Sequence, residues 1–226
     1  MSAEKDKREH RLARARLYLI CGAEPGGTEP EPFLRAALAG GVDVVQLRQK
    51  GAGDDGLLAA AARFRSCCDE QDALFILNDR PDLARAAGAD GAHVGQDDEP
   101  LERARELAGE ELLVGVSTHT PEQVDTARDG GADYIGVGPV LATPTKPDEP
   151  AVGFGLVEYA AEHEHVVPFF AIGGIDRLTL AAVMAAGARR IAVVRAIVDA
   201  SDPGAAAREL RQGLEGAPQE TGFGAA

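Results

Sequence analysis

The chain of 226 residues has the length of a single domain, and its charge excludes two classes of partner. Acidic residues outnumber basic residues by 37 to 23, which gives a formal net charge of -14. A surface this acidic repels nucleic acid and anionic membranes, so we expect neither as a partner. No apolar run is long enough to span a bilayer, and the charged N-terminus lacks the apolar stretch of a signal peptide.

Lysine and cysteine usage favours a reducing, salt-rich cytoplasm. Lysine is scarce and occurs only as Lys5, Lys7, Lys50 and Lys146. An acid excess with scarce lysine is typical of a halophilic protein, because salt screens like-charge repulsion; an ordinary acidic protein rich in arginine is the alternative. The cysteines fit neither a disulfide framework nor a C-x2-C metal site, so we expect small buried thiols at Cys21, Cys67 and Cys68.

One unit recurs eight times along the chain: a short apolar run, then a helical pattern rich in Ala, Leu, Glu and Arg. The eight expected strands are 17–21, 42–47, 74–77, 92–94, 112–116, 134–137, 167–172 and 191–194. Helices are expected to begin near Glu31, Asp54, Pro81, Pro100, Pro121, Phe154, Asp176 and Pro203.

Strands that alternate with helices predict a parallel sheet with right-handed crossovers. Eight units in this length favour an α/β fold with a single closed (β/α)8 TIM barrel. A doubly wound open sheet is the weaker alternative, because no G-x-G-x-x-G follows the first strand. We expect a charged helical extension over residues 1–16, the barrel over 17–212 and a flexible tail over 213–226. Assembly into a homo-oligomer stays open.

Polar residues follow the expected strands at the end where barrel enzymes carry their working groups. These segments are 46–50, 78–80, 95–98, 117–119, 143–146, 173–174 and 194–195. Asp79 and Asp98 suit Mg²⁺, which proteins hold by one or two carboxylates together with substrate phosphate oxygens. Lys50, Lys146 and Arg48 would neutralise the remaining phosphate charge.

Each of these features also has a structural explanation. Asn78 and Asp79 could cap the helix expected at Pro81, and Asp98 could belong to a solvated acidic loop. His119 could be a general base, although a lone histidine after a strand is more often a structural hydrogen-bonding group. The occurrence of all these residues at one end of the barrel favours a functional site.

Six motifs occur in order at the expected strand ends: QLRQK at 46–50, NDR at 78–80, HVGQDD at 93–98, GVSTHT at 115–120, GVGPVLATPTK at 136–146 and AIGGI at 171–175. With these motifs the chain resembles the thiamine phosphate synthase family over roughly residues 17–200. The resemblance implies a transferase. It would condense 4-amino-2-methyl-5-hydroxymethylpyrimidine diphosphate with hydroxyethylthiazole phosphate, with Mg²⁺ as cofactor, by a dissociative displacement of pyrophosphate.

The resemblance also implies roles for individual residues. Asp79 and Asp98 would bind Mg²⁺. The pyrimidine diphosphate would be held by Gln46, Leu47, Arg48, Gln49, Lys50, Asn78, Ser117 and Lys146, of which Lys146, Lys50, Arg48 and Ser117 would be catalytic. The thiazole phosphate would be held by Thr143, Pro144, Thr145, Gly174, Val194 and Arg195.

The chain departs from the family pattern at three positions. The family often has acids where this chain has Gln49 and Arg80, and commonly has serine at the position of Arg195. Two alternatives to the synthase are considered: a thiazole tautomerase of the same fold, and a non-catalytic barrel that binds a phosphorylated metabolite.

Overall fold

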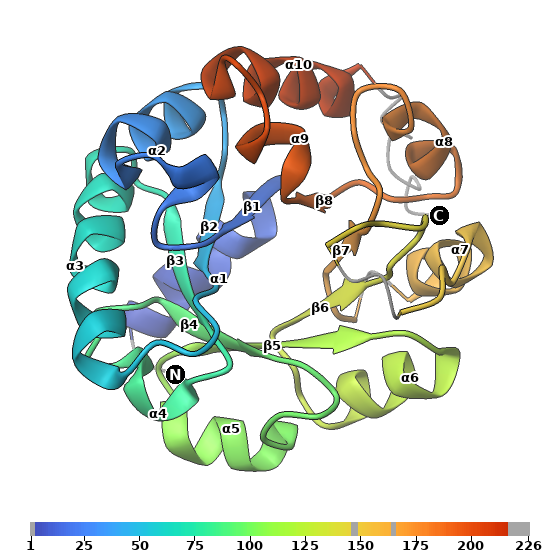
Figure 1. Ribbon diagram of the computed structural model, residues 1–226. Coiled ribbons are helices and arrows are strands. Elements are labelled where there is room, and N and C mark those ends of the chain that lie inside the picture. The colour runs from blue at the N-terminus through green and yellow to red at the C-terminus, as the bar shows by residue number, and fades with distance from the viewer. Residues whose placement is uncertain (1–2, 146–148, 164–165, 217–226) are drawn as a thin grey trace.

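Eight parallel strands pair in sequence order and close into a barrel in the computed structural model, which describes residues 3–145, 149–163 and 166–216 (Figure 1). Closure is set by β8 pairing with β1, where Leu17 lies opposite Ile191. This pairing confirms the (β/α)8 barrel and excludes the open sheet. The strands, β1 to β8, are Leu17–Cys21, Val44–Leu47, Leu74–Asn78, Gly91–Val94, Leu113–Thr118, Tyr134–Val137, Phe169–Ile172 and Ile191–Val193.

Helices surround the barrel, and most begin within one residue of the expected positions (Figure 1). The helix expected near Asp176 begins four residues later. The Asp176 carboxylate accepts hydrogen bonds from the N–H groups of Leu178 and Thr179, which holds a turn before the helix. The helices, α1 to α10, are Ala3–Arg14, Pro30–Ala39, Asp54–Glu70, Pro81–Ala84, Leu101–Ala108, Pro121–Asp129, Phe154–Glu162, Leu180–Ala185, Arg195–Val198 and Pro203–Glu215.

The strands bury one set of side chains against the helices and another inside the barrel, because successive residues of a strand point to opposite faces. Leu47 and Leu77 belong to the outer cluster, between strands and helices. The inner cluster includes Tyr18, Ile76 and Phe170. The inner side chains fill the barrel, so a ligand has room only at its carboxyl-terminal rim. The three cysteines are buried and free, as expected.

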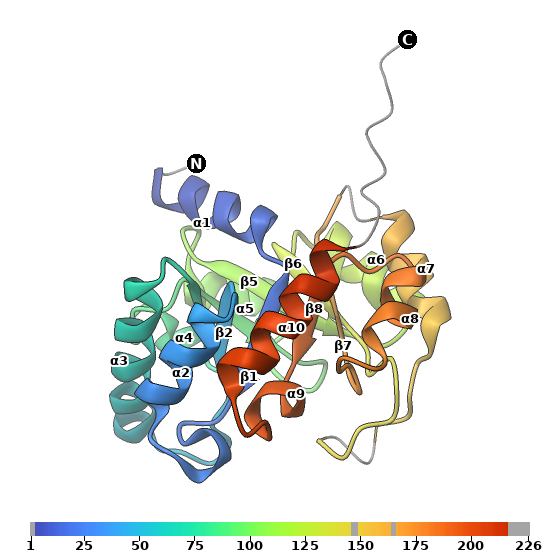
Figure 2. The same cartoon turned by 90° about the horizontal axis from the view of Figure 1, so that it is seen from above.

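Helix α1 lies at the amino-terminal end of the barrel, opposite α9 (Figure 2). Its Leu12 packs into the inner cluster beside Tyr18. At the other end of the chain, α10 runs to Glu215 with Leu214 fully buried, so the barrel's last helix extends past the boundary expected at 212. In the described part of the chain, no helix combines the length and the apolar character needed to cross a membrane.

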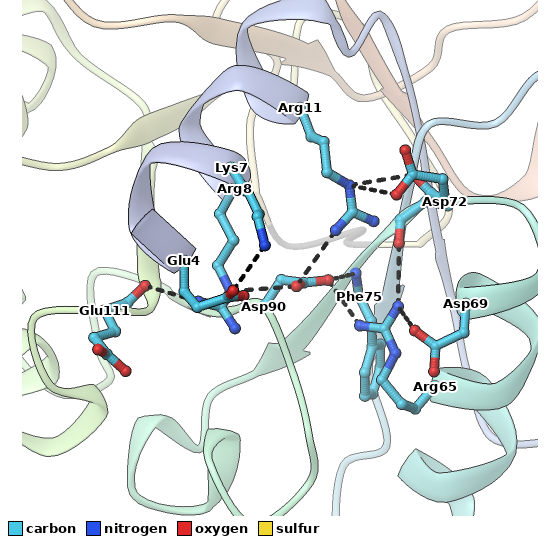
Figure 3. A network of polar contacts seen from close by, with 11 residues as sticks. Glu4, Lys7, Arg8, Arg11, Arg65, Asp69, Asp72, Phe75, Asp90 and Glu111 are labelled. Carbon is cyan, nitrogen blue, oxygen red and sulfur yellow. Dashed lines mark hydrogen bonds and ion pairs between the residues drawn. The ribbon is translucent and has the colours of Figure 1, made fainter. Parts of the chain in front are cut away.

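Asp90 fixes α1 to the barrel through a buried network of charges (Figure 3). Its carboxylate accepts hydrogen bonds from Arg8 at 3.3 Å, from Arg65 at 2.7 Å and from the N–H of Phe75 at 2.9 Å. Arg11 adds an ion pair at 3.7 Å. One carboxylate whose side chain is 9% exposed therefore joins α1, α3 and β3.

Asp90→Asn should lower the free energy of unfolding by about 3 kcal/mol, because it removes the one buried carboxylate that Arg8, Arg11 and Arg65 share. Urea unfolding of the parent and the variant measures the loss. Asp72→Asn is the matched control: its carboxylate also pairs with α1, through Arg11, but its side chain is 89% exposed. We expect the control to change stability by less than about 1 kcal/mol. Equal losses in the two variants would contradict the role given to Asp90.

Candidate active site

A cavity of about 530 Å³ opens at the carboxyl-terminal rim of the barrel and collects residues from every strand end. Parallel strands in a closed barrel all finish at this rim, which is why segments far apart in the sequence meet here. Most of the residues singled out from the sequence line the cavity: Gln46, Arg48, Lys50, Asn78, Asp79, Asp98, Ser117, Thr143, Pro144, Thr145, Gly174, Val194 and Arg195.

Two of the expected site residues that the structure describes, Leu47 and Gln49, are not among those that line it. Leu47 is fully buried in the outer cluster, because strand alternation turns its side chain away from its neighbour Gln46. Its side chain therefore faces the helices and not the cavity. Gln49 accepts a hydrogen bond from the N–H of Ala23 at 2.9 Å and borders a smaller cavity of about 240 Å³. Lys146 lies outside the described residues.

Asp79 and Asp98 face one another across the ends of β3 and β4. Asp79 has a left-handed backbone, φ 61°, and its N–H donates to the carbonyl of His93 at 2.8 Å. The Asp98 carboxylate accepts from the N–H of Gly95 at 2.8 Å, which directs it toward the end of its own strand. Neither acid caps α4, whose N-cap is Arg80 and which has no side-chain cap. The capping explanation for Asp79 is therefore wrong.

The pKa of Asp79 is raised from 3.8 to about 6. Partial burial is the largest cause, followed by a hydrogen bond and charge repulsion from Asp98; Lys50 and Arg48 act in the opposite direction. A carboxyl whose ionisation is disfavoured by a facing carboxylate forms part of a site that a cation would stabilise. In the part of the chain that is described, no group of three or more metal-binding side chains occurs. A cation held here would complete its coordination with water or ligand oxygens.

The cationic side of the rim comes from the segment after β2. Arg48 is half-buried, and its N–H donates to the carbonyl of Cys21 at 2.9 Å, which fixes its backbone. Lys50, two residues later, is exposed and lines the same cavity. Two cations therefore lie on the rim with the carboxylate pair, an arrangement suited to a polyanion and a divalent ion together.

The loops after β6 and β7 pack against each other on the opposite side of the cavity. A Cβ on Gly173 would lie 2.4 Å from the Cα of Pro139, and one on Gly174 would lie 2.7 Å from the Cβ of Leu141. Both glycines also have positive φ. Only glycine fits this approach, which leaves backbone exposed beside Thr143 for an anion.

Arg195 and His119 are both held by neighbouring groups at the cavity. Arg195 begins α9 and donates from Nε to Asp199 at 2.9 Å. His119 forms a hydrogen bond through Nδ1 with the carbonyl of Gly138. The structural role expected for His119 is thereby confirmed, although its ring also borders the cavity.

The floor of the cavity contains three polar residues that the sequence analysis did not identify: Tyr18, His93 and Tyr134. They form a hydrogen-bonded chain between Gln46 and Ser117. A signal for them was present. Each is a polar side chain at an inward-facing strand position, and His93 lies within the HVGQDD segment.

Asp98→Asn should lower the pKa of Asp79, because it removes the facing negative charge and keeps an oxygen for the N–H of Gly95. Burial keeps that pKa above its ordinary value. A raised carboxyl pKa means that the folded state loses stability as pH rises from 3.8 to about 6. Without divalent cations, the variant should therefore be the more stable protein above pH 6, by about 2–4 °C in melting temperature for each kcal/mol of repulsion removed.

Thermal melting across pH and ¹³C NMR titration of the Asp79 carboxyl measure the two effects. The stability gain should disappear below pH 3.8, where Asp79 is protonated in both the folded and the unfolded state. Asp97→Asn is the matched control, since this acid is exposed and is not among the residues that line the cavity. An Asp79 pKa that is unchanged in Asp98→Asn, or lowered equally by Asp97→Asn, would contradict the pairing.

Comparisons with known proteins agree on one family. A family model described as thiamine monophosphate synthase matches residues 17–197. A thiamine-phosphate synthase of Mycobacterium tuberculosis is 50% identical over 219 residues, which cover 92% of this chain and 99% of that protein. The solved thiamine phosphate pyrophosphorylase from Pyrococcus furiosus is 33% identical with a TM-score of 0.82, and the match covers 92% of this chain and 97% of that one.

A more distant match shows how much the fold alone conveys. The structure of a 3-hexulose-6-phosphate synthase has a TM-score of 0.65 at 23% identity over 88% of this chain and 99% of its own. This likeness shows the barrel and nothing of the chemistry. The family model, in contrast, spans all eight strands whose ends form the cavity. The chain belongs to the thiamine monophosphate synthase family.

Proposed function

We propose that this protein condenses 4-amino-2-methyl-5-hydroxymethylpyrimidine diphosphate with hydroxyethylthiazole phosphate to give thiamine phosphate and pyrophosphate. The observation that carries the proposal is the facing pair Asp79 and Asp98 on the same rim as Lys50 and Arg48. A divalent ion bridging to a diphosphate needs carboxylates and cations side by side. Family membership supports the same reaction.

The donor set fits Mg²⁺. This ion retains several waters and uses one or two carboxylates with substrate phosphate oxygens, so a two-carboxylate site is sufficient. A bound cation would relieve the repulsion between Asp79 and Asp98. When bound, Mg²⁺ supplies charge stabilisation to the departing diphosphate.

The reaction requires no general base. The attacking atom is the thiazole ring nitrogen, which carries no proton, and the product is a charged thiazolium. The barrier lies in separating the pyrimidine methylene from its diphosphate, and the pyrimidine amino group stabilises positive charge on that methylene. Lys50 and Arg48 stabilise the leaving anion, and we propose the same role for Lys146, which lies outside the described residues.

The second substrate is held on the other side of the cavity. The glycine backbone at Gly173 and Gly174, the hydroxyls of Thr143 and Thr145, and the guanidinium of Arg195 border one region of the rim. We propose that they bind the thiazole phosphate. In this fold the loops after strands seven and eight often hold phosphate. Anchoring the phosphate keeps the ring nitrogen near the methylene, so proximity lowers the barrier.

The two alternatives fit the site less well. A tautomerase needs an acid–base residue, for which His119 stays a candidate through Nε2, since its Nδ1 is bonded to Gly138. A tautomerase has no use, however, for the Asp79–Asp98 pair. A non-catalytic barrel would bind phosphate without releasing pyrophosphate.

We further propose that the protein works in a reducing cytoplasm on these small molecules, in line with its buried free thiols.

Incubating the protein with both substrates and Mg²⁺ and measuring pyrophosphate and thiamine phosphate tests the function. We expect the two products in equal amounts, and none after Mg²⁺ is removed with a chelator. Proton exchange on a thiazole carboxylate phosphate without pyrophosphate would favour the tautomerase. Binding without either reaction would favour the silent barrel.

Lys50→Ala should reduce turnover by about 10- to 1000-fold, the scale for losing one electrostatic stabiliser of the leaving group. Pyrophosphate release under saturating substrates measures the change. Lys7→Ala is the control, because Lys7 is an exposed lysine of α1 that pairs with Glu4 at the far end of the barrel. Turnover within twofold of the parent in Lys50→Ala would reject the role of Lys50.

A further inference from the structure

Five polar side chains from five strands form one continuous hydrogen-bonded chain across the floor of the cavity. Gln46 Nε2 donates to the Tyr18 hydroxyl at 2.8 Å, and the Tyr18 and Tyr134 hydroxyls lie 3.1 Å apart. Tyr134 then lies 3.2 Å from His93 Nδ1, and His93 Nε2 lies 3.0 Å from Ser117 Oγ. The two ends, Gln46 and Ser117, line the cavity.

The three residues inside this chain are buried, although they also border the cavity. Tyr18 and Tyr134 are 2% and 1% exposed, and His93 is 9% exposed. Burial is the largest cause that raises the pKa of both tyrosines, so each hydroxyl keeps its single hydrogen. In such surroundings each buried hydrogen needs an acceptor, because an unmet donor is costly. The hydrogen bonds of this chain therefore run in one donor-to-acceptor direction. Counting the donors determines that direction.

Counting starts at Gln46, whose amide nitrogen donates to Tyr18. The hydrogen of Tyr18 must then go to Tyr134, and the hydrogen of Tyr134 to Nδ1 of His93. An Nδ1 that accepts belongs to the neutral imidazole whose hydrogen is on Nε2, and this hydrogen is donated to Ser117. Two groups remain for a ligand: the Ser117 hydrogen as a donor and the Gln46 Oε1 as an acceptor.

The structure supports the availability of both groups. Among the described residues, Ser117 Oγ forms a hydrogen bond only with His93, and Gln46 Oε1 accepts none. Gln46 Oε1 is also absent from the buried side-chain atoms without a partner, so it is open to the cavity. A ligand with a hydrogen-bond donor near Gln46 and an anionic oxygen near Ser117 would satisfy both ends.

We propose that Tyr18, Tyr134 and His93 are positioning residues that fix the hydrogen-bond direction of the site. They present Ser117 to the substrate only as a donor and Gln46 Oε1 only as an acceptor. This inference rests on the proposed function for its substrates: the diphosphate is the anionic acceptor, and the pyrimidine amino group is the donor. A pyrimidine with an oxo group in place of the amino group offers an acceptor at that position and is disfavoured.

The reverse direction is the competing arrangement. It requires the Gln46 amide to turn over, every hydrogen of the chain to change its acceptor, and His93 to carry its hydrogen on Nδ1. Ser117 would then direct lone pairs at the diphosphate, which is repulsive. Because each hydroxyl and a neutral imidazole carry one hydrogen each, no mixed arrangement satisfies every link while His93 is neutral.

The ¹⁵N NMR spectrum of the imidazole rings in the ligand-free protein tests the direction without any substrate. We expect His93, assigned by comparison with His93→Gln, to have an unprotonated Nδ1 and a protonated Nε2. Tyr134→Phe removes the donor to Nδ1 and should produce a mixture of tautomers. Tyr18→Phe separates Tyr134 from the Gln46 donor that fixes the direction, so it should also produce a mixture of tautomers. Tyr159→Phe, outside the chain on α7 with its hydroxyl bonded to Asp125, is the control.

A double-mutant cycle on pyrophosphate release tests the consequence for the reaction. Ser117→Ala should lower kcat by about 10- to 100-fold in the parent, the scale of one hydrogen bond to a charged group. In the Tyr134→Phe background the same substitution should cost less than threefold, because Ser117 is no longer held as a donor. Changes in KM alone would indicate a purely structural role and overturn the proposal.

The outcomes separate the two proposals. A His93 with its hydrogen on Nδ1, or an equal cost of Ser117→Ala in both backgrounds, overturns the positioning chain and leaves the synthase intact. A parent protein that releases no pyrophosphate overturns the proposed function. In that case the tautomer measurement still decides the direction of the chain.

Discussion

Closure of the barrel is the constraint on which the rest of the structure depends. Because β8 pairs with β1, all eight strands end at one rim, and residues as far apart in sequence as Arg48 and Arg195 border one cavity. The filled interior and helix α1 close the opposite end, where Asp90 holds the helix through buried ion pairs. The cavity therefore has a polar rim and a solid floor, and these two parts contribute differently to function.

The rim works through charge. In a chain with a net charge of -14, a pair of facing carboxylates is the less expected part of an anion site. The proposed cation explains the pair, since Asp79 and Asp98 alone would repel an anionic ligand. The raised pKa of Asp79 reflects, in part, the repulsion between its carboxylate and that of Asp98. Lys50 and Arg48 offset this rise in pKa only in part, so a divalent ion would stabilise the carboxylates further.

The sequence predicted the barrel and most of the rim, because strand ends in a parallel barrel must converge. It could not give the direction of each side chain. Leu47 lies inside the QLRQK segment, yet strand alternation turns it into the outer core. Gln49 is withdrawn by a hydrogen bond to a loop far away in sequence. The floor residues Tyr18 and Tyr134 were missed because aromatic residues on strands are ordinarily core, and only coordinates show that their hydroxyls meet.

The floor of the cavity can distinguish between organic groups, which the charged rim cannot do. Charge attracts any diphosphate, and a metal ion bridges any pair of phosphates, so neither distinguishes the organic group that carries them. A hydrogen-bonded chain with a single direction does, because it presents one acceptor and one donor at fixed places. In the proposed reaction, an acceptor at Gln46 would favour a substrate amino group, and a donor at Ser117 would stabilise the departing oxygen as its charge grows. Selectivity and rate would then follow from one arrangement of hydrogens, held by residues that need not touch the substrate.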